Sequence, residues 1–211
     1  KLSLPQKISI VLYAGRIYKW KGIDILLDAA ERCKEIFFYI VGGTADELAR
    51  VSGKSIHPVI PAESYTSVAL GDVSLSKARN NGTSLQNVVC VGSRRYEEIP
   101  LWLAAADVLL VLGTKENEYS YFHTSPMKLL EYMAAQRPIV ASDTPANREI
   151  VADAEAFFYE PDNLQDMAAK IYDAFMERKK IEEKTKAALK KTKQYSWHER
   201  ASAILKFMDI Q

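Results

Sequence analysis

The stretch that decides the fold is HTSPMKLLEYMAAQRPIVASDTPANREI, residues 123–150. Its pattern predicts a helix, a buried strand and a second helix in close succession. Ser125 can cap the first helix, and Pro126 suits the first helical position, where the missing N–H is not needed. Pro138 follows the helical pattern and opens the strand at residues 138–142. A strand enclosed by helices in this way is typical of α/β proteins.

A lysine stands near the start of the first helix, where the helix macrodipole favours anions instead. Lys128 falls in this first turn. Free backbone N–H groups at a helix start form a phosphate site, so we expect an anion beside Lys128. Glu131 shares a helix face with Lys128 and suits the ribose hydroxyls of a nucleotide diphosphate. The alternative is a solvated ion pair on an amphipathic helix.

Strand and helix patterns alternate along the chain. Buried strands are expected at residues 8–14, 36–41, 88–91, 108–112, 138–142 and 157–159. Helices are expected at residues 23–34, 45–51, 75–80, 97–106, 125–135, 145–151, 163–177, 178–193 and 197–209, with loops at 52–71 and 113–124. The alternation predicts an α/β fold with a doubly wound parallel sheet, Rossmann-like in kind. Ligands of such folds bind beyond the carboxyl ends of the strands.

The composition is that of an ordinary soluble globular chain. Its 211 residues are 48% hydrophobic and 26% charged, with a net charge of +1. This balance argues against a general nucleic-acid binder. The chain lacks an apolar run of about 18 residues and a signal-peptide pattern, so we expect a cytoplasmic protein. Cys33 and Cys90 are isolated and are expected to be buried thiols, and the scattered histidines predict no metal site.

Cations and glycines follow several of the predicted strands. Arg16 and Lys21 come after the first strand, and a guanidinium with an ammonium suits a diphosphate leaving group. They could equally be surface residues that precede a helix. Gly43 and Gly92 follow two further strands and would let a ligand approach the backbone closely. Neither G-x-G-x-x-G nor G-x-x-x-x-G-K-[ST] occurs, which argues against a dinucleotide-dependent dehydrogenase and a P-loop ATPase.

Several short motifs follow one another along the chain in a characteristic order. They are Gly15-Arg16 with Lys21-Gly22-Ile23-Asp24, Val41-Gly42-Gly43, Asn87-Val88 with Gly92, Ala105-Ala106-Asp107-Val108, Ser125 to Ala134, and Pro138 to Asp143 with Arg148-Glu149. In this order and spacing they resemble the C-terminal half of the retaining GT-B glycosyltransferases of group 1, glycosyltransferase family 4. The ending Tyr195-Ser196-Trp197 with Arg200-Ala201 is similar as well. The resemblance extends over residues 8–207.

The resemblance implies that residues 1–211 form a nucleotide-sugar-binding domain, with the helices at about 178–209 packing on or beyond it. The N-terminal acceptor domain would lie outside this chain, and we expect the chain alone to be inactive. Arg16 and Lys21 would be the catalytic residues that hold the departing diphosphate. The donor-binding residues implied are Gly15, Gly43, Gly92, Arg94, Ser125, Pro126, Met127, Lys128 and Glu131. His123 stands where the family has a glutamate and is a candidate contact of the transferred sugar.

Preorganised cations and helix N–H groups can stabilise a leaving diphosphate without a metal, so we expect neither a metal nor another cofactor. The expected partners are a nucleotide-diphosphate sugar, the acceptor domain, and a glycan or lipid-linked acceptor at the inner face of the membrane, but no nucleic acid. The basic stretch 178–193 fits a membrane surface or, with its thin apolar face, a solvated helix. Two other functions stay open, namely a non-catalytic nucleotide-binding module and a GT-B-type nucleotide-sugar epimerase.

Overall fold

The computed structural model describes residues 8–56, 84–124 and 127–208. Within these ranges, parallel strands form a six-stranded sheet in the order β5-β2-β1-β6-β7-β8. The strands are β1 (Ser9–Ala14), β2 (Ile36–Val41), β5 (Val88–Gly92), β6 (Val108–Val111), β7 (Ile139–Ser142) and β8 (Phe157–Tyr159). The order in which strands are added to the sheet reverses between β1 and β6. Doubly wound sheets have their ligand-binding crevice at this switch point. The predicted fold class is confirmed.

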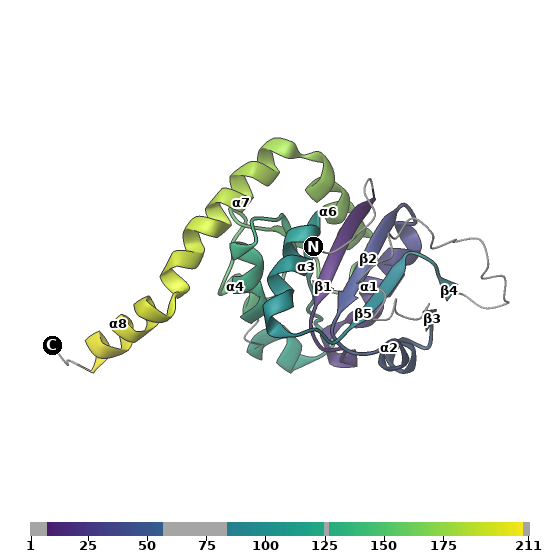
Figure 1. Ribbon diagram of the computed structural model, residues 1–211, viewed down its shortest axis with the longest axis horizontal. Helices are drawn as coiled ribbons and strands as arrows, with labels where there is room; N and C mark the ends of the chain where they lie inside the picture. The colour runs from purple at the N-terminus through teal and green to yellow at the C-terminus, as the bar shows by residue number, and fades with distance from the viewer. Residues whose placement is uncertain (1–7, 57–83, 125–126, 209–211) are drawn as a thin grey trace.

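Helices cover both faces of the sheet (Figure 1). They are α1 (Ile23–Arg32), α2 (Ala45–Ser52), α3 (Ile99–Ala105), α4 (Met127–Ala134), α5 (Pro145–Arg148), α6 (Leu164–Met176), α7 (Arg178–Thr192) and α8 (Trp197–Phe207). Alternate residues of β1 enter two different cores. Val11 and Tyr13 pack with α1 and α6, whereas Ile10 and Leu12 pack with α3 and α4. Because both faces are buried, the strands read as continuous apolar runs.

The expected loop at residues 113–124 is wrong in part. Tyr119–His123 forms a π-helical turn. Polar side chains fix this turn, because the Ser120 N–H donates to Asn117 Oδ1 at 2.9 Å and the Thr124 hydroxyl donates to the Ser120 carbonyl at 3.2 Å. Residues 113–124 lack a regular apolar period, so the sequence pattern could not reveal a turn that side-chain hydrogen bonds hold.

Smaller differences concern element ends. The helix expected from Glu97 begins with a 3-10 turn, Tyr96–Glu98, before α3. β3 (Ser55–Ile56), in the stretch that was expected to be a loop, forms a short parallel pair with β4 (Ser84–Leu85). The helix expected at residues 75–80 lies outside the described residues, as does most of the loop expected at residues 52–71. Cys33 and Cys90 are free, buried thiols, as expected.

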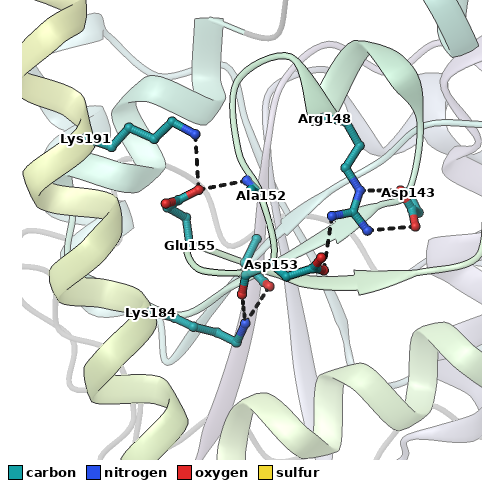
Figure 2. A network of polar contacts seen from close by, with 8 residues as sticks. Asp143, Arg148, Ala152, Asp153, Glu155, Lys184 and Lys191 are labelled. Carbon is teal, nitrogen blue, oxygen red and sulfur yellow. Dashed lines mark hydrogen bonds and ion pairs between the residues drawn. The ribbon is translucent and has the colours of Figure 1, made fainter.

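The basic helix α7 is anchored to the domain by two of its lysines. Lys184 donates to the carbonyl of Asp153, as Figure 2 shows, and also to that of Ala156 at 2.9 Å. Lys191 pairs with Glu155 at 3.1 Å, and Glu155 also accepts the Ala152 N–H. These contacts tie α7 to the segment before β8. Two cations of the basic stretch therefore serve packing within the domain.

The last helix, α8, leaves the domain and runs toward the C-terminus, away from the sheet (Figure 1). None of its residues is buried. In the described ranges, no helix is long and apolar enough to cross a bilayer.

Candidate functional site

A hollow of about 320 Å³ opens at the carboxyl ends of β1 and β6. Its walls include the aromatic rings of Tyr13, Trp20 and Tyr119, and its cations are Lys21 and Lys128. The lining residues come from β1, the turn after it, the end of β6, the π-helical turn and α4. The hollow therefore lies at the point where the strand order reverses, which is the position expected for a ligand of this fold.

Helix α4 begins beside this hollow. Met127, its first residue, lines the hollow together with Lys128. The Ala14 N–H donates to Tyr132 Oη at 2.7 Å, which fixes α4 against the end of β1. The predicted cap residues, Ser125 and Pro126, lie outside the described residues. The start of α4 thus presents a cation at a helix end that favours anions.

The ammonium of Lys128 turns inward over the protein. Its Nζ lies 4.3 Å from the centre of the Tyr13 ring. A Cβ built on Gly15 would lie 2.0 Å from this Nζ, so a side chain at position 15 would displace the lysine. Burial and the nearby charge of Lys21 lower the pKa of Lys128 to about 7, although Glu131 acts in the opposite direction. An anion in the hollow would favour the charged lysine.

Lys21 and Arg16 lie on the turn after β1. The Lys21 ammonium is 5.1 Å from the ring centres of both Tyr18 and Trp20, which stack on each other, and burial lowers its pKa. Arg16 is exposed and donates to Tyr18 Oη at 3.3 Å. Its carbonyl accepts the Tyr13 hydroxyl at 3.1 Å. Lys21 lines the hollow, whereas Arg16 stands beside it.

The predicted strand-end glycines lie along the same edge of the sheet. The Gly15 N–H donates to the Val41 carbonyl at 2.7 Å, and the Gly42 N–H donates to the Gly92 carbonyl at 2.9 Å. Gly43 has a φ of 72°, which favours glycine. Neither Gly43 nor Gly92 lines the 320 Å³ hollow.

Three further candidates stand outside the lining of the hollow. Arg94 donates to its neighbour Ser93 at 3.1 Å, and its guanidinium lies 5.9 Å from the Trp102 ring centre. His123 is exposed and lies 6.4 Å from Tyr119, centre to centre. Glu131 is half-buried and acts on Lys128 through its charge.

The aromatic members of the site were not predicted. Tyr13, Trp20 and Tyr119 line the hollow, and Trp20 and Tyr119 meet edge to face at 5.4 Å. Only Tyr13 gave a usable signal, because a tyrosine in an apolar strand needs a partner for its hydroxyl. The other two lie on irregular segments that come together only in the folded chain.

A second hollow, of about 550 Å³, lies on the other side of Trp20, which lines both. Its charged lining includes Asp24, Asp28, Glu116 and Asp162. Lys19 also lines it, but the four carboxylates outweigh this one cation and would repel a diphosphate, so the smaller hollow suits an anion better. Among the described residues, no group of three or more His, Cys, Asp or Glu side chains could hold a metal ion.

The sequence matches a family model described as "Glycosyl transferases group 1" over residues 8–176. No curated protein sequence matches significantly. Solved structures match at low identity. Sucrose-phosphate synthase from Thermosynechococcus elongatus has a TM-score of 0.71 and 21% identity over 99% of this chain and 46% of its own. HepE from Anabaena, solved with UDP and glucose, has a TM-score of 0.63 and 20% identity over 89% of this chain and 44% of its own.

A third match is a domain solved by itself. The C-terminal domain of the group 1 protein LpcC from Francisella tularensis has a TM-score of 0.60 and 19% identity over 92% of this chain and 89% of its own. The chain thus spans about half the length of the first two proteins and nearly all of this domain. With the family model and the sheet order, these matches assign the chain: it belongs to the group 1 glycosyltransferases and has the fold of the C-terminal half of a GT-B enzyme.

Proposed function

We propose that the chain is the donor-binding domain of a retaining glycosyltransferase and receives a nucleotide-diphosphate sugar in the hollow between β1 and α4. The observation that carries the proposal is the convergence of Lys21, Lys128 and the start of α4 on this hollow. A diphosphate would be held by both ammonium groups and the helix N–H groups. HepE, a structural match, has been solved with UDP-glucose, which makes that compound the first to test.

The chemistry proposed is the stabilisation of the leaving diphosphate. As the bond to the sugar breaks, negative charge grows on the diphosphate oxygens. Lys21 and Lys128 would meet this charge from fixed positions, and Arg16 would reach it from the exposed turn. Donors of this kind typically contribute about 10²–10³ in rate each, so we propose that the reaction needs no metal.

The remaining candidates have assigned places in this proposal. Glu131 would accept the ribose hydroxyls, and His123 would contact the transferred sugar. The backbone near Met127 would cap the phosphates. Gly92 and Arg94 would lie near the base, although they stand outside the lining of the hollow. The acceptor would be a glycan or a lipid-linked glycan, in the cytoplasm or at the inner face of its membrane.

The acceptor would bind to a second domain. This agrees with the finding that the chain spans about half of the longer proteins that it matches. Helix α8 and its C-cap offer an apolar stripe for such a partner. Trp197 and Ile204 of the helix and Met208 at the C-cap lie on one side and are 81%, 50% and 57% exposed. We therefore propose that the donor domain alone does not catalyse transfer.

Calorimetry with UDP-glucose, GDP-mannose and ADP-glucose tests this function. We expect saturable binding of one of them to the wild type. The affinity should fall about tenfold or more in Lys21→Ala and Glu131→Ala, because each removes a charged hydrogen-bonding group. Lys179→Ala, on the exposed side of α7, is the control and should bind normally. Binding of no compound would contradict the proposal and favour a structural module.

A further inference from the structure

Tyr13 contacts two of the residues assigned to the diphosphate, Lys128 and Arg16. It is only 2% exposed and lies near the carboxyl end of β1. The face of its ring is 4.3 Å from the Lys128 Nζ, and its hydroxyl donates to the Arg16 carbonyl at 3.1 Å. One side chain therefore contacts the first turn of α4 and the turn after β1 together.

We propose that Tyr13 is a positioning residue of the donor site, whose ring holds the Lys128 ammonium and whose hydroxyl holds the backbone that carries Arg16. This inference rests on the proposed function, since Lys128 and Arg16 are assigned there to the diphosphate. Tyr13 would not itself react. It would set the two cations in place before the nucleotide sugar arrives.

The ring contact has a clear electrostatic role. An ammonium over an aromatic face is attracted to the negative face of the ring quadrupole. The other charged groups that act on Lys128 are Lys21, which disfavours its charged form, and Glu131, which favours it. Tyr13 supplies attraction from the side of β1. Gly15 makes the contact possible, because a Cβ there would lie 2.0 Å from Nζ.

The hydroxyl contact acts on the turn after β1. The Arg16 side chain is exposed and bonds only to Tyr18 in the described part of the chain. Its backbone is held from below by the Tyr13 hydroxyl. If this hydrogen bond is lost, the turn gains conformational freedom. Binding of the nucleotide sugar must then order the turn, which lowers the affinity.

The ring contact can be tested without changing the shape of the side chain. We compare Tyr13→Phe with Tyr13→3,4,5-trifluorophenylalanine, because fluorination weakens the negative ring face while it keeps the ring. The pKa of Lys128 is followed by NMR of ¹³C-methylated lysines without ligand. We expect fluorination to lower the midpoint by about half to one pH unit, a three- to tenfold change in the protonation equilibrium. Phe38→3,4,5-trifluorophenylalanine, buried on β2, is the control and should leave the midpoint unchanged.

The hydroxyl contact is tested by the affinity for UDP-glucose at pH 6, where Lys128 is charged. We expect Tyr13→Phe to bind about three- to tenfold more weakly than the wild type, as the loss of one hydrogen bond implies. Tyr172→Phe, on α6, is the matched control. It also removes a tyrosine hydroxyl that donates a hydrogen bond, here to Glu35, but this bond does not involve the hollow. In the variant Arg16→Ala, the Tyr13→Phe effect should shrink.

Three outcomes separate the proposals. If fluorination leaves the Lys128 midpoint unchanged in a folded protein, the ring contact is overturned. If Tyr13→Phe binds UDP-glucose like the wild type while Arg16→Ala binds weakly, the hydroxyl role is overturned. If the wild type binds no nucleotide sugar at all, the proposed function fails and the positioning role in a donor site falls with it, even where the NMR shift is present.

Discussion

Lys21 and Lys128 reach the same hollow from different elements, Lys21 from the 3-10 turn after β1 and Lys128 from the first turn of α4. The charge of Lys21 adds to burial in lowering the pKa of Lys128. Without a ligand, the repulsion between two like charges near a helix start lowers the stability of the fold. A diphosphate between them would turn this repulsion into attraction, which is how a binding site trades stability for function.

The first prediction is that Lys128→Met stabilises the free protein. The pKa of Lys128 is about 7 in the folded chain and its ordinary value is 10.5. At pH values between these two, the unfolded state binds a proton at this lysine more readily than the folded state does. The lysine therefore lowers the free energy of unfolding at neutral pH. We expect a gain of about 1 kcal/mol at pH 7, kept small because the side chain is partly exposed and solvent screens part of its charge.

Urea denaturation at pH 7 measures this gain, and calorimetry with UDP-glucose should show that the same variant loses affinity. Lys179→Met, an exposed lysine of α7, should change neither quantity. A Lys128→Met protein that is less stable than the wild type would contradict the prediction, since it would mean that the lysine is a net stabilising group.

The second prediction concerns pH. In the free protein Lys128 titrates at about pH 7, and a bound diphosphate would raise that pKa. Below pH 7 the lysine is already charged, and we expect UDP-glucose to bind most tightly there. Above pH 7 binding must take up a proton, so the affinity falls by up to about tenfold per pH unit. Both phosphates of UDP-glucose are esterified and do not titrate in this range.

Calorimetry at pH 8 in two buffers with different heats of ionisation counts the protons directly. We expect an uptake approaching one proton in the wild type and none in Lys128→Met. If binding to the wild type proceeds without proton uptake at pH 8, the proposed contact between Lys128 and the diphosphate is wrong.

The third prediction concerns Asn87, which precedes β5. Its buried Nδ2 lies 2.8 Å from the Ala30 carbonyl, 3.0 Å from that of Cys33 and 2.9 Å from that of Ile36. Asn87→Leu removes the donor and leaves carbonyls buried without it, which we expect to cost about 1–3 kcal/mol. Asn87→Asp should cost more, because it brings a negative charge toward these carbonyls.

Thermal denaturation above and below pH 4 distinguishes the two variants. Protonation of the new carboxyl restores one donor, so Asn87→Asp should regain part of its stability relative to Asn87→Leu at low pH. Equal stabilities of both variants at all pH values would show that the donor contributes little.

The sheet could be predicted because each buried strand is a continuous apolar run with a glycine or polar residue after it. β2 lies at residues 36–41, as expected, and most other ends differ by only a few residues. The motif at Asn87 was part of the family resemblance, but its role was not predictable. That role depends on three carbonyls around the end of α1, which only the folded chain brings to one point.

The site was predicted less completely than the fold. Three of the predicted residues line the hollow, namely Lys21, Met127 and Lys128. They could be predicted because a residue that follows a strand or begins a helix can be located from the sequence. Arg94 and His123 do not line the hollow. Their directions depend on loops whose course is set by tertiary contacts, such as the Ser120 bonds that hold the π-helical turn.

The last prediction compares two glycines with similar backbone angles. Gly43 and Gly53 have φ values of 72° and 68°, so alanine at either position costs about 1 kcal/mol for the left-handed conformation. At Gly53 an added Cβ meets nothing within 4 Å, whereas at Gly43 it lies 2.6 Å from the buried Ile17 Cδ1. Gly43→Ala must therefore also move Ile17, which we expect to add about 1–3 kcal/mol. Urea denaturation of both variants measures the difference directly. Because Ile17 lies next to Arg16, Gly43→Ala should also weaken UDP-glucose binding while Gly53→Ala leaves it unchanged, and equal losses of stability in the two variants would show that Ile17 can yield without cost.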